Sequence, residues 1–122
     1  MKLNITVSLE RDDQVARIRL QGGLNTDTAP EFDQCLQEQV AQNRKLVVLD
    51  MEELDYISSA GLRVIFKASK ESKAKGNYLA ATNRKPHVEK VFEILQDVPG
   101  MSVFANDEAL ALYLQELLKT NS

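Results

Sequence analysis

Two adjacent serines carry the most suggestive chemistry in the sequence. Ser58 and Ser59 are followed by the small residues Ala60 and Gly61, and then by an amphipathic stretch of helical period. The first N–H groups of a helix lack intrahelical partners and carry partial positive charge, so a hydroxyl placed there lies in a site suited to anions. Two uses are open: such a serine can cap the helix, or it can accept a phosphoryl group.

A phosphate on such a serine would change the charge of the loop without breaking the helix. It adds about −1.5 to −2 charges and strong acceptor oxygens beside the free N–H groups. A partner protein that docks apolar or acidic groups on the same loop would meet an opposing charge there. The loop is therefore suited to a switch in which phosphorylation controls the binding of a partner protein.

Motifs of the common catalytic sites are missing from the sequence. It has no G-x-x-x-x-G-K-[ST] phosphate loop, no G-x-G-x-x-G fingerprint and no G-x-S-x-G nucleophile elbow. We expect His87, the only histidine, to be solvated or locally hydrogen-bonded, and Cys35, the only cysteine, to fill space beside an apolar helix stripe. One cysteine and one histidine exclude a Cys/His zinc cage within one chain. We therefore expect no catalytic residue, no metal and no cofactor; an enzyme using Ser58 and Ser59 as an anion pocket is the least supported alternative.

The N-terminal residues predict a β-hairpin. Apolar and polar residues alternate over Leu3–Leu9 and again over Ala16–Leu20, with a polar turn between them. This period of two is typical of half-buried strands, and two such runs so close together favour an antiparallel pair. Gly22 and Gly23 are expected to end the second strand.

A helix and a buried strand are expected next. Apolar spacing predicts a helix over residues 29–43, and Thr28 and Glu31 fit a capping box at its start. The unbroken apolar run Leu46–Leu49 predicts a strand covered on both faces. Residues 50–56 lean polar, so we expect a solvated connection there.

Helices and strands continue to alternate in the second half of the chain. Predicted helices start at Ser58, at residues 83–86 and at residues 106–108, and predicted strands are Tyr78–Ala81 and Met101–Phe104. The apolar side of the helix after Ser58 consists of Leu62, Ile65, Phe66 and Ser69, and Pro99 and Gly100 break the next one. The order β-β-α-β-α-β-α-β-α predicts one α/β domain over residues 1–122, with a mixed, mostly parallel sheet that opens with an antiparallel hairpin.

Composition limits the classes of partner. The chain has 122 residues, of which 43% are hydrophobic and 27% charged, as in ordinary globular domains. A formal net charge of −3 provides no basic footprint for nucleic acid, and no apolar run approaches the roughly 20 residues that span a bilayer. The first ten residues alternate and lack the apolar block of a signal peptide. We expect a cytoplasmic protein that neither binds nucleic acid nor inserts into a membrane; its oligomeric state stays open.

Several segments match, in order and spacing, the pattern of one known family. Ile57–Leu62 reads I-S-S-A-G-L, Gly22–Ala29 reads G-G-L-N-T-D-T-A, and Leu46–Asp50 reads L-V-V-L-D. These segments resemble the signature loop, the strand-to-helix turn and the buried central strand of the STAS domain, the fold of bacterial anti-sigma factor antagonists. Lys85–Leu95 followed by Phe104 is similar to its third helix and last strand. The resemblance covers nearly the whole chain.

This resemblance implies a protein switch without catalysis of its own. In such antagonists a serine in D-S-[STA]-G is phosphorylated by a serine kinase of the GHKL ATPase type that is also the anti-sigma factor. The unphosphorylated antagonist captures this partner, and a PP2C-type phosphatase resets it. Laid on this sequence, the acceptor is Ser59, and the start of the second helix is expected to be exposed. The partner-binding residues would be Asn25, Thr26, Asp27, Thr28, Ser58, Ala60, Gly61, Leu62 and Arg63.

Two departures from the family pattern keep alternatives open. The aspartate that usually precedes the acceptor is Ser58 here, which makes Ser58 the second candidate for modification. The aspartate of the family's turn is Asn25, which removes another charge near the site. The resemblance also allows a constitutive subunit or scaffold that does not cycle phosphate, since a STAS protein also sits on the ATPase of a bacterial lipid-transport machine.

Overall fold

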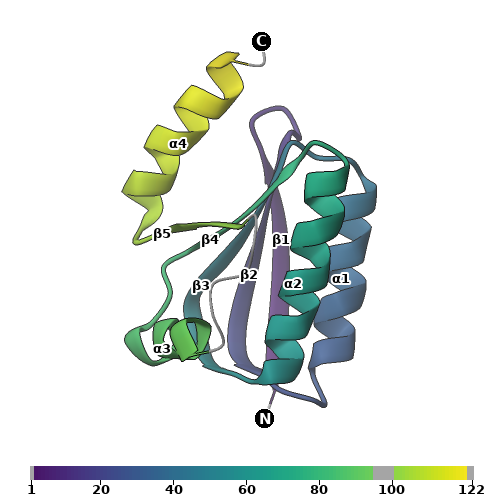
Figure 1. Cartoon of the computed structure of the whole chain (residues 1–122), viewed down its shortest axis with the longest axis vertical. Coiled ribbons are helices and arrows are strands. Elements are labelled where there is room, and N and C mark those ends of the chain that lie inside the picture. Colours follow the sequence, from purple (N-terminus) through teal and green to yellow (C-terminus); the bar gives the residue numbers. More distant parts are fainter. Residues whose placement is uncertain (1, 95–100, 121–122) are drawn as a thin grey trace.

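After an opening hairpin, helices and strands alternate along the chain, as the sequence predicts (Figure 1). The structure, a computed structural model, describes residues 2–94 and 101–120. The predicted helix break at Pro99 and Gly100, like Leu95, lies outside these residues. The elements within them are β1 (Leu3–Glu10), β2 (Val15–Leu24), α1 (Ala29–Ala41), β3 (Leu46–Ile57), α2 (Ser59–Ala74), β4 (Tyr78–Thr82), α3 (Pro86–Ile94), β5 (Met101–Phe104) and α4 (Asp107–Thr120).

The strands form one sheet in the order β1-β2-β3-β4-β5. β1 is antiparallel to β2, and all other neighbours are parallel. This confirms the predicted mixed, mostly parallel sheet. Since β2 and β3 run in the same direction, their carboxyl ends lie at one edge, where Leu24 pairs with Ile57. The chain enters α1 and α2 from that edge.

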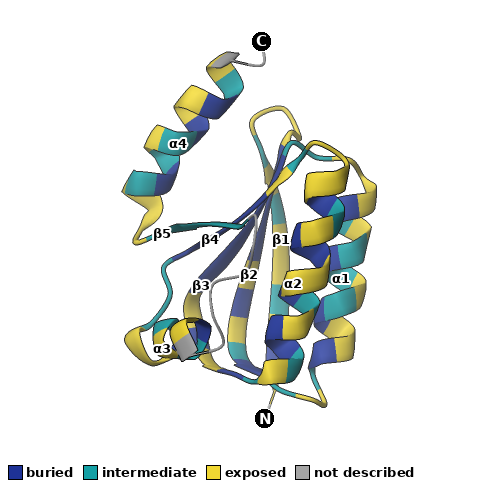
Figure 2. Cartoon of the chain, in the orientation of Figure 1, coloured by how far each residue is buried: buried dark blue, intermediate teal, exposed yellow. Residues whose placement is uncertain are grey.

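Helices pack on both faces of the sheet. Alternate residues of β3 point to opposite faces: Val47 belongs to the cluster that includes Phe32 of α1 and Ile65 of α2. Its neighbour Val48 belongs to a second cluster with Leu114 of α4. Figure 2 shows the buried residues of α1 and α2 on the sides that face the sheet. The strand is therefore covered on both faces, as its unbroken apolar run predicts.

β3 is much longer than the sequence predicts. It runs from Leu46 to Ile57, so the expected polar connection over residues 50–56 is wrong. The pairing of β3 with β2 shifts register twice, between Arg19 and Gln21 and between Gly22 and Gly23. Each shift inserts an extra residue and changes which side chains face the core. The strand thereby loses the regular alternation by which it could be recognised in the sequence.

β2 likewise continues through its two glycines instead of ending there. Gly22 has a φ of +107°, and a Cβ at this position would lie 2.2 Å from the carbonyl oxygen of Lys2. Gly23 N donates to the same oxygen at 3.0 Å. The glycines thus allow the start of β1 to approach β2 closely, and β2 reaches Leu24.

Candidate functional site

Two loops are joined at the edge of the sheet where α1 and α2 begin. The two helices lie side by side and start at the same end of the molecule (Figure 1). Ser58 N donates a hydrogen bond to the carbonyl oxygen of Leu24 at 2.8 Å. This bond connects the β3–α2 junction to the end of β2. Two segments are predicted to bind a partner, residues 25–28 and 58–63. They therefore begin next to each other, at the two positions that this hydrogen bond joins.

The two serines differ in what their hydroxyls do. Ser58 is the N-cap of α2, with φ −102° and ψ 174°, and its Oγ accepts a hydrogen bond from Gly61 N at 3.4 Å. Its side chain is partly buried. Ser59 is the first residue of the helix and is exposed, and within the described part of the chain nothing hydrogen-bonds its hydroxyl. Capping therefore belongs to Ser58, and Ser59 presents its hydroxyl to solvent.

Gly61 is needed for packing rather than for backbone freedom. A Cβ on it would lie 2.6 Å from Leu24 Cγ and 3.1 Å from Ile57 Cγ1. Both distances are shorter than ordinary contacts of a Cβ, so a side chain at this position would force the Leu24 side chain or the first turn of α2 to move. The missing side chain thus lets the first turn of α2 seat directly on the strand ends.

The turn before α1 is fixed by its own polar side chains. Asn25 Oδ1 accepts hydrogen bonds from Asp27 N at 2.9 Å and Thr28 N at 3.0 Å. Thr28 Oγ1 accepts from Asn25 N and donates to the carbonyl oxygen of Gly23, both at 2.9 Å. Thr28 is the N-cap of α1, but its side chain makes no capping bond. The predicted capping box with Glu31 is wrong because the Thr28 hydroxyl is already used within the turn.

The predicted partner-binding residues are unequally accessible. Thr26 and Asp27 are exposed at the tip of the turn, as is Arg63 on α2. Leu62 is only 7% exposed and belongs to the main core cluster. The expectation that Leu62 is exposed is therefore wrong. Its spacing from Ile65 already placed it on the apolar side of the helix, which faces the sheet.

A shallow groove on the outer side of α2 begins one residue after Ser59. Phe66 is 36% exposed within it, and Lys70 Nζ lies 4.5 Å from the centre of the Phe66 ring. Lys67 Nζ lies 3.5 Å from the Asp33 carboxylate of α1. The groove is lined by Ala60, Arg63, Val64, Phe66, Lys67, Lys70 and Glu71. The sequence pattern assigned Phe66 to the buried side, and no signal in it indicated this groove.

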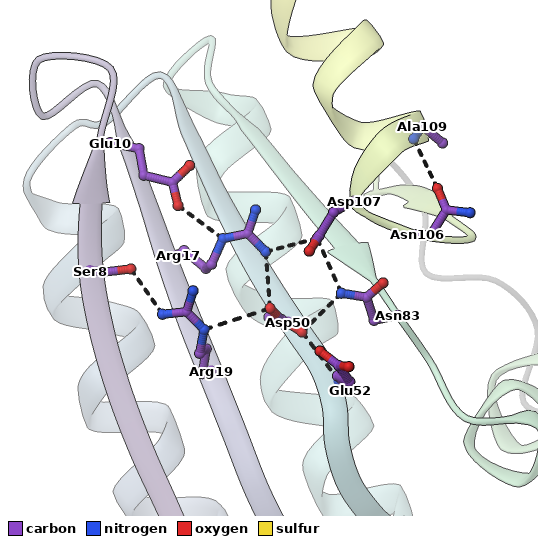
Figure 3. A network of polar contacts seen from close by, with 10 residues as sticks. All are labelled: Ser8, Glu10, Arg17, Arg19, Asp50, Glu52, Asn83, Asn106, Asp107 and Ala109. Atoms are coloured by element: carbon purple, nitrogen blue, oxygen red, sulfur yellow. Dashed lines mark hydrogen bonds and ion pairs between the residues drawn. The ribbon is translucent and has the colours of Figure 1, made fainter.

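A buried ionic network on the opposite face was also missed. Arg17 Nη1 lies 3.0 Å from Asp50 and 3.1 Å from Asp107, and its Nε lies 2.9 Å from Glu10 (Figure 3). Asn83 Nδ2 donates to Asp50 at 3.2 Å and to Asp107 at 3.1 Å. Burial lowers the pKa of Arg17, but hydrogen bonds and charges from the neighbouring carboxylates outweigh it and raise the pKa overall. Asp50, predicted to lie in a solvated turn, is instead buried in this network, and Arg17 and Asn83 connect it to Asp107 at the start of α4.

The remaining candidate side chains have local structural partners. His87 is exposed, as expected of a solvated histidine, and its Nε2 lies 2.5 Å from the carbonyl oxygen of Asp55 on β3. A hydrogen bond and the charge of Lys85 lower the pKa of the exposed Asp55. Cys35 is half-buried against the core; burial, and then the charge of nearby carboxylates, raises its pKa, which disfavours the reactive thiolate.

Residues 2–94 and 101–120 contain neither a cluster of metal ligands nor a helix that could span a membrane. No three His, Cys, Asp or Glu side chains of this part gather in a way that could hold a metal ion. No helix of the same part has the length and apolar character needed to cross a membrane.

The sequence matches a known family over most of its length. Residues 6–110 match the family model described as "STAS domain". The chain is also 39% identical, over 88 residues, to a putative anti-sigma factor antagonist, BtrV, of Bordetella bronchiseptica. That match covers 72% of this chain and 76% of BtrV.

Solved structures share the fold at lower sequence identity. A putative anti-sigma factor antagonist of Thermotoga maritima, tm1081, superposes with a TM-score of 0.80 at 17% identity, covering 93% of each chain. The anti-sigma factor antagonist SpoIIAA in its unphosphorylated form gives a TM-score of 0.71 at 18% identity, covering 92% of this chain and 98% of SpoIIAA. The phosphorylated form of Bacillus SpoIIAA gives 0.69 at 19% identity, covering 90% and 99%.

Proposed function

The chain belongs to the STAS domain family, and from this premise we propose that it is a phospho-switched anti-sigma factor antagonist without catalysis of its own. Unphosphorylated, it binds a serine kinase of the GHKL ATPase type that is also an anti-sigma factor. That kinase transfers the γ-phosphoryl group of ATP to Ser59 Oγ, ADP is released as the leaving group, the hydroxyl proton passes to solvent, and the complex dissociates. A PP2C-type phosphatase then hydrolyses the phosphoserine and restores binding.

The observation that carries this proposal is the different exposure of the two serines. Ser59 is exposed at the first position of α2, whereas Ser58 is partly buried and caps the helix. A kinase must bring its ATP to an accessible hydroxyl. Of the two serines, only Ser59 has an exposed hydroxyl that can be modified without losing the capping hydrogen bond of α2. This favours Ser59 over Ser58 as the acceptor.

The position of Ser59 also suits a switch that leaves the fold intact. A phosphoserine there lies at the positive end of α2, beside N–H groups that have no intrahelical acceptor. Negative charge at a helix N-terminus is stabilising by about 0.3–1 kcal/mol. Phosphorylation is therefore expected to change the surface of the protein and not its folding.

The surface that changes includes the groove along α2. Ala60 and Arg63 lie at the end of this groove that is next to Ser59. A charge of about −1.5 to −2 at this end would pair with Arg63 and repel acidic groups of a bound partner. Like charges placed opposite each other in an interface cost several kcal/mol, enough to dissociate a moderately tight complex.

The names of two relatives support the proposed function of a phosphorylated anti-sigma factor antagonist. BtrV carries the name of a putative anti-sigma factor antagonist, and SpoIIAA is known in both unphosphorylated and phosphorylated forms. We extend the phosphorylation of SpoIIAA to this chain at Ser59, the position that its motif and exposure favour.

The test is mass spectrometry of the protein isolated from its own cells, with fragmentation to locate any phosphate. We expect a fraction of the molecules to be heavier by about 80 Da, the mass of one added phosphoryl group, with the group on Ser59. Ser59→Ala should abolish this species, and the matched variant Ser58→Ala should retain it. A phosphate on Ser58, or an unmodified protein under every growth condition, would contradict the proposal.

Partner capture separates the switch from a constitutive subunit. Ser59→Ala should still co-purify with its partner kinase, because a methyl group fills almost the same space as the hydroxymethyl group. Ser59→Asp should lose part of that partner, whereas Leu112→Asp, which adds the same charge at an exposed residue of α4 outside the predicted partner surface, should not. Equal co-purification of the wild type, Ser59→Ala and Ser59→Asp would indicate a fixed subunit instead.

A further inference from the structure

The outer edge of β1 is long, regular and open. β1 is at one end of the strand order, so within the described residues only β2 pairs with it. All eight residues of Leu3–Glu10 pair with β2 in an unbroken register. The other edge strand, β5, has four residues. An edge strand leaves a row of N–H and C=O groups that can pair with another strand.

Over Leu3–Leu9, β1 lacks the sequence features that usually prevent such pairing. Proteins protect edges with proline, with charged side chains inside the strand, or with bulges. Leu3–Leu9 contains neither proline nor a charged residue, and charges occur only at its flanks, in Lys2 and Glu10. Val7 is 38% exposed and Leu9 43% exposed, although both are large and apolar. Burial of these two side chains by another strand would be favourable.

We propose that β1 pairs with β1 of a second copy of this chain, antiparallel and centred on Thr6, to form a symmetric dimer with a continuous sheet. Thr6 then faces Thr6 of the second copy. On the apolar side, Ile5 faces Val7 and Leu3 faces Leu9. At both ends Lys2 faces Glu10.

The amino-acid sequence of β1 selects this register. A shift of one residue would place the apolar side of one strand on the polar side of the other. A shift of two residues would keep the apolar sides together but place Lys2 opposite Ser8, or Glu10 opposite Asn4. Only pairing centred on Thr6 engages every residue from Lys2 to Glu10 and joins opposite charges at both ends, which favours a second copy over an unrelated strand. None of the residues near Ser59 takes part.

Site-specific disulfide formation tests the register. In a Cys35→Ala background, Thr6→Cys should form a disulfide-linked dimer under mild oxidation. Opposed residues of antiparallel strands have Cα atoms about 4.5–5.5 Å apart, which is compatible with a disulfide. The matched control Asn4→Cys places the two cysteines about 14 Å apart along the strands, so it should not link to itself. An equimolar mixture of Asn4→Cys and Ser8→Cys should link, because Asn4 faces Ser8.

Sedimentation equilibrium tests the association without a cross-link. The wild-type chain should pass from monomer to dimer as its concentration rises, and Val7→Lys should raise the dissociation constant at least about tenfold. Leu112→Lys, which adds the same charge at a residue of α4 that is 67% exposed, should leave it unchanged. A monomer at every concentration up to millimolar, or Asn4→Cys linking as fast as Thr6→Cys, would overturn the proposal.

Discussion

The guanidinium of Arg17 lies 3.0 Å from the carboxylate of Asp50, and the two side chains are only 9% and 6% exposed. Removing two charges from water is costly, and their attraction compensates only when further hydrogen bonds satisfy both groups. Glu10, Asp107 and Asn83 supply those bonds. The ion pair therefore joins β2 and β3 to the start of α4, on the face of the sheet away from α1 and α2 (Figure 3).

Loss of Arg17 should destabilise the protein strongly. Arg17→Met leaves the buried Asp50 carboxylate without its main partner, and the free energy of unfolding should fall by about 3–5 kcal/mol. Arg19→Met, which removes a side chain that is 54% exposed and lies 3.8 Å from the same carboxylate, should cost less than about 1 kcal/mol. Urea denaturation of both variants measures the difference. Equal effects would contradict a dominant role of Arg17.

A double variant checks the mechanism. Arg17→Met combined with Asp50→Leu removes both buried charges, so it should be more stable than Arg17→Met alone. If the double variant is less stable than the single one, packing by the Arg17 side chain, and not the unpaired carboxylate, accounts for the loss.

The ion pair of Asp55 with Lys85 predicts a small pH dependence of stability. The hydrogen bond and charge of Lys85 lower the pKa of Asp55 from its ordinary value of 3.8. A lowered pKa in the folded state means that this pair stabilises the protein above the unfolded-state pKa. The contribution is lost as the pH falls through the folded-state pKa. The effect is small because Asp55 is exposed.

NMR titration of the Asp55 carboxyl group measures this shift directly. In Lys85→Met its pKa should rise toward 3.8, because the hydrogen bond and the positive charge are both lost. Lys85→Arg keeps the charge and should keep most of the shift. An unchanged pKa in Lys85→Met would assign the shift to another group, of which the nearby His87 is the first candidate.

The order of elements could be predicted from the sequence, but the extent of β2 and β3 could not. A sequence pattern defines a strand when side chains alternate strictly, as they do over Leu3–Leu9, or when a short apolar run is unbroken, as it is over Leu46–Leu49. The register shifts opposite Arg19 and Gly22 break that alternation, so the second half of β3 resembles a polar loop. The sequence did not indicate the ionic network of Arg17 and Asp50 either. Asp50 directly follows an apolar run, and only the tertiary fold brings Arg17 beside it.

The candidate site was predictable where its residues act locally. Ser58 and Ser59 precede a helical pattern, so their place at its start followed from the sequence alone. Which serine caps the helix depends on one backbone conformation, that of Ser58, and could not be read from adjacent identical residues. The exposure of Phe66 depends on how α2 is rotated against α1, and helical period alone does not fix that rotation.

We expect Gly61→Ala to lower the free energy of unfolding, and a second substitution at Leu24 tests the cause. An added methyl group would lie 2.6 Å from Leu24 Cγ, and overpacking of this kind costs about 1–3 kcal/mol. Leu24→Ala removes the atoms that collide, so Gly61→Ala should cost less in that background than in the wild type. Urea denaturation of the two single variants and the double variant measures this coupling. Strict additivity would show that Leu24 is not the obstacle.

Substitution of Ser58 should lower the stability of the protein, whereas substitution of Ser59 should remove its phosphate. Ser58→Ala removes the hydroxyl that accepts from Gly61 N, and loss of an N-cap costs about 1 kcal/mol, while the Ser59 phosphate should remain. Ser59→Ala places a good helix former at the first helical position, so it should leave the free energy of unfolding within about 0.5 kcal/mol of the wild type and abolish the phosphate. Urea denaturation of the two variants measures the change in the free energy of unfolding, and intact-mass measurement of the same samples detects the phosphate. A Ser59→Ala protein that is strongly destabilised would give this hydroxyl a structural role, and it would remove the basis on which Ser59 was preferred as the acceptor.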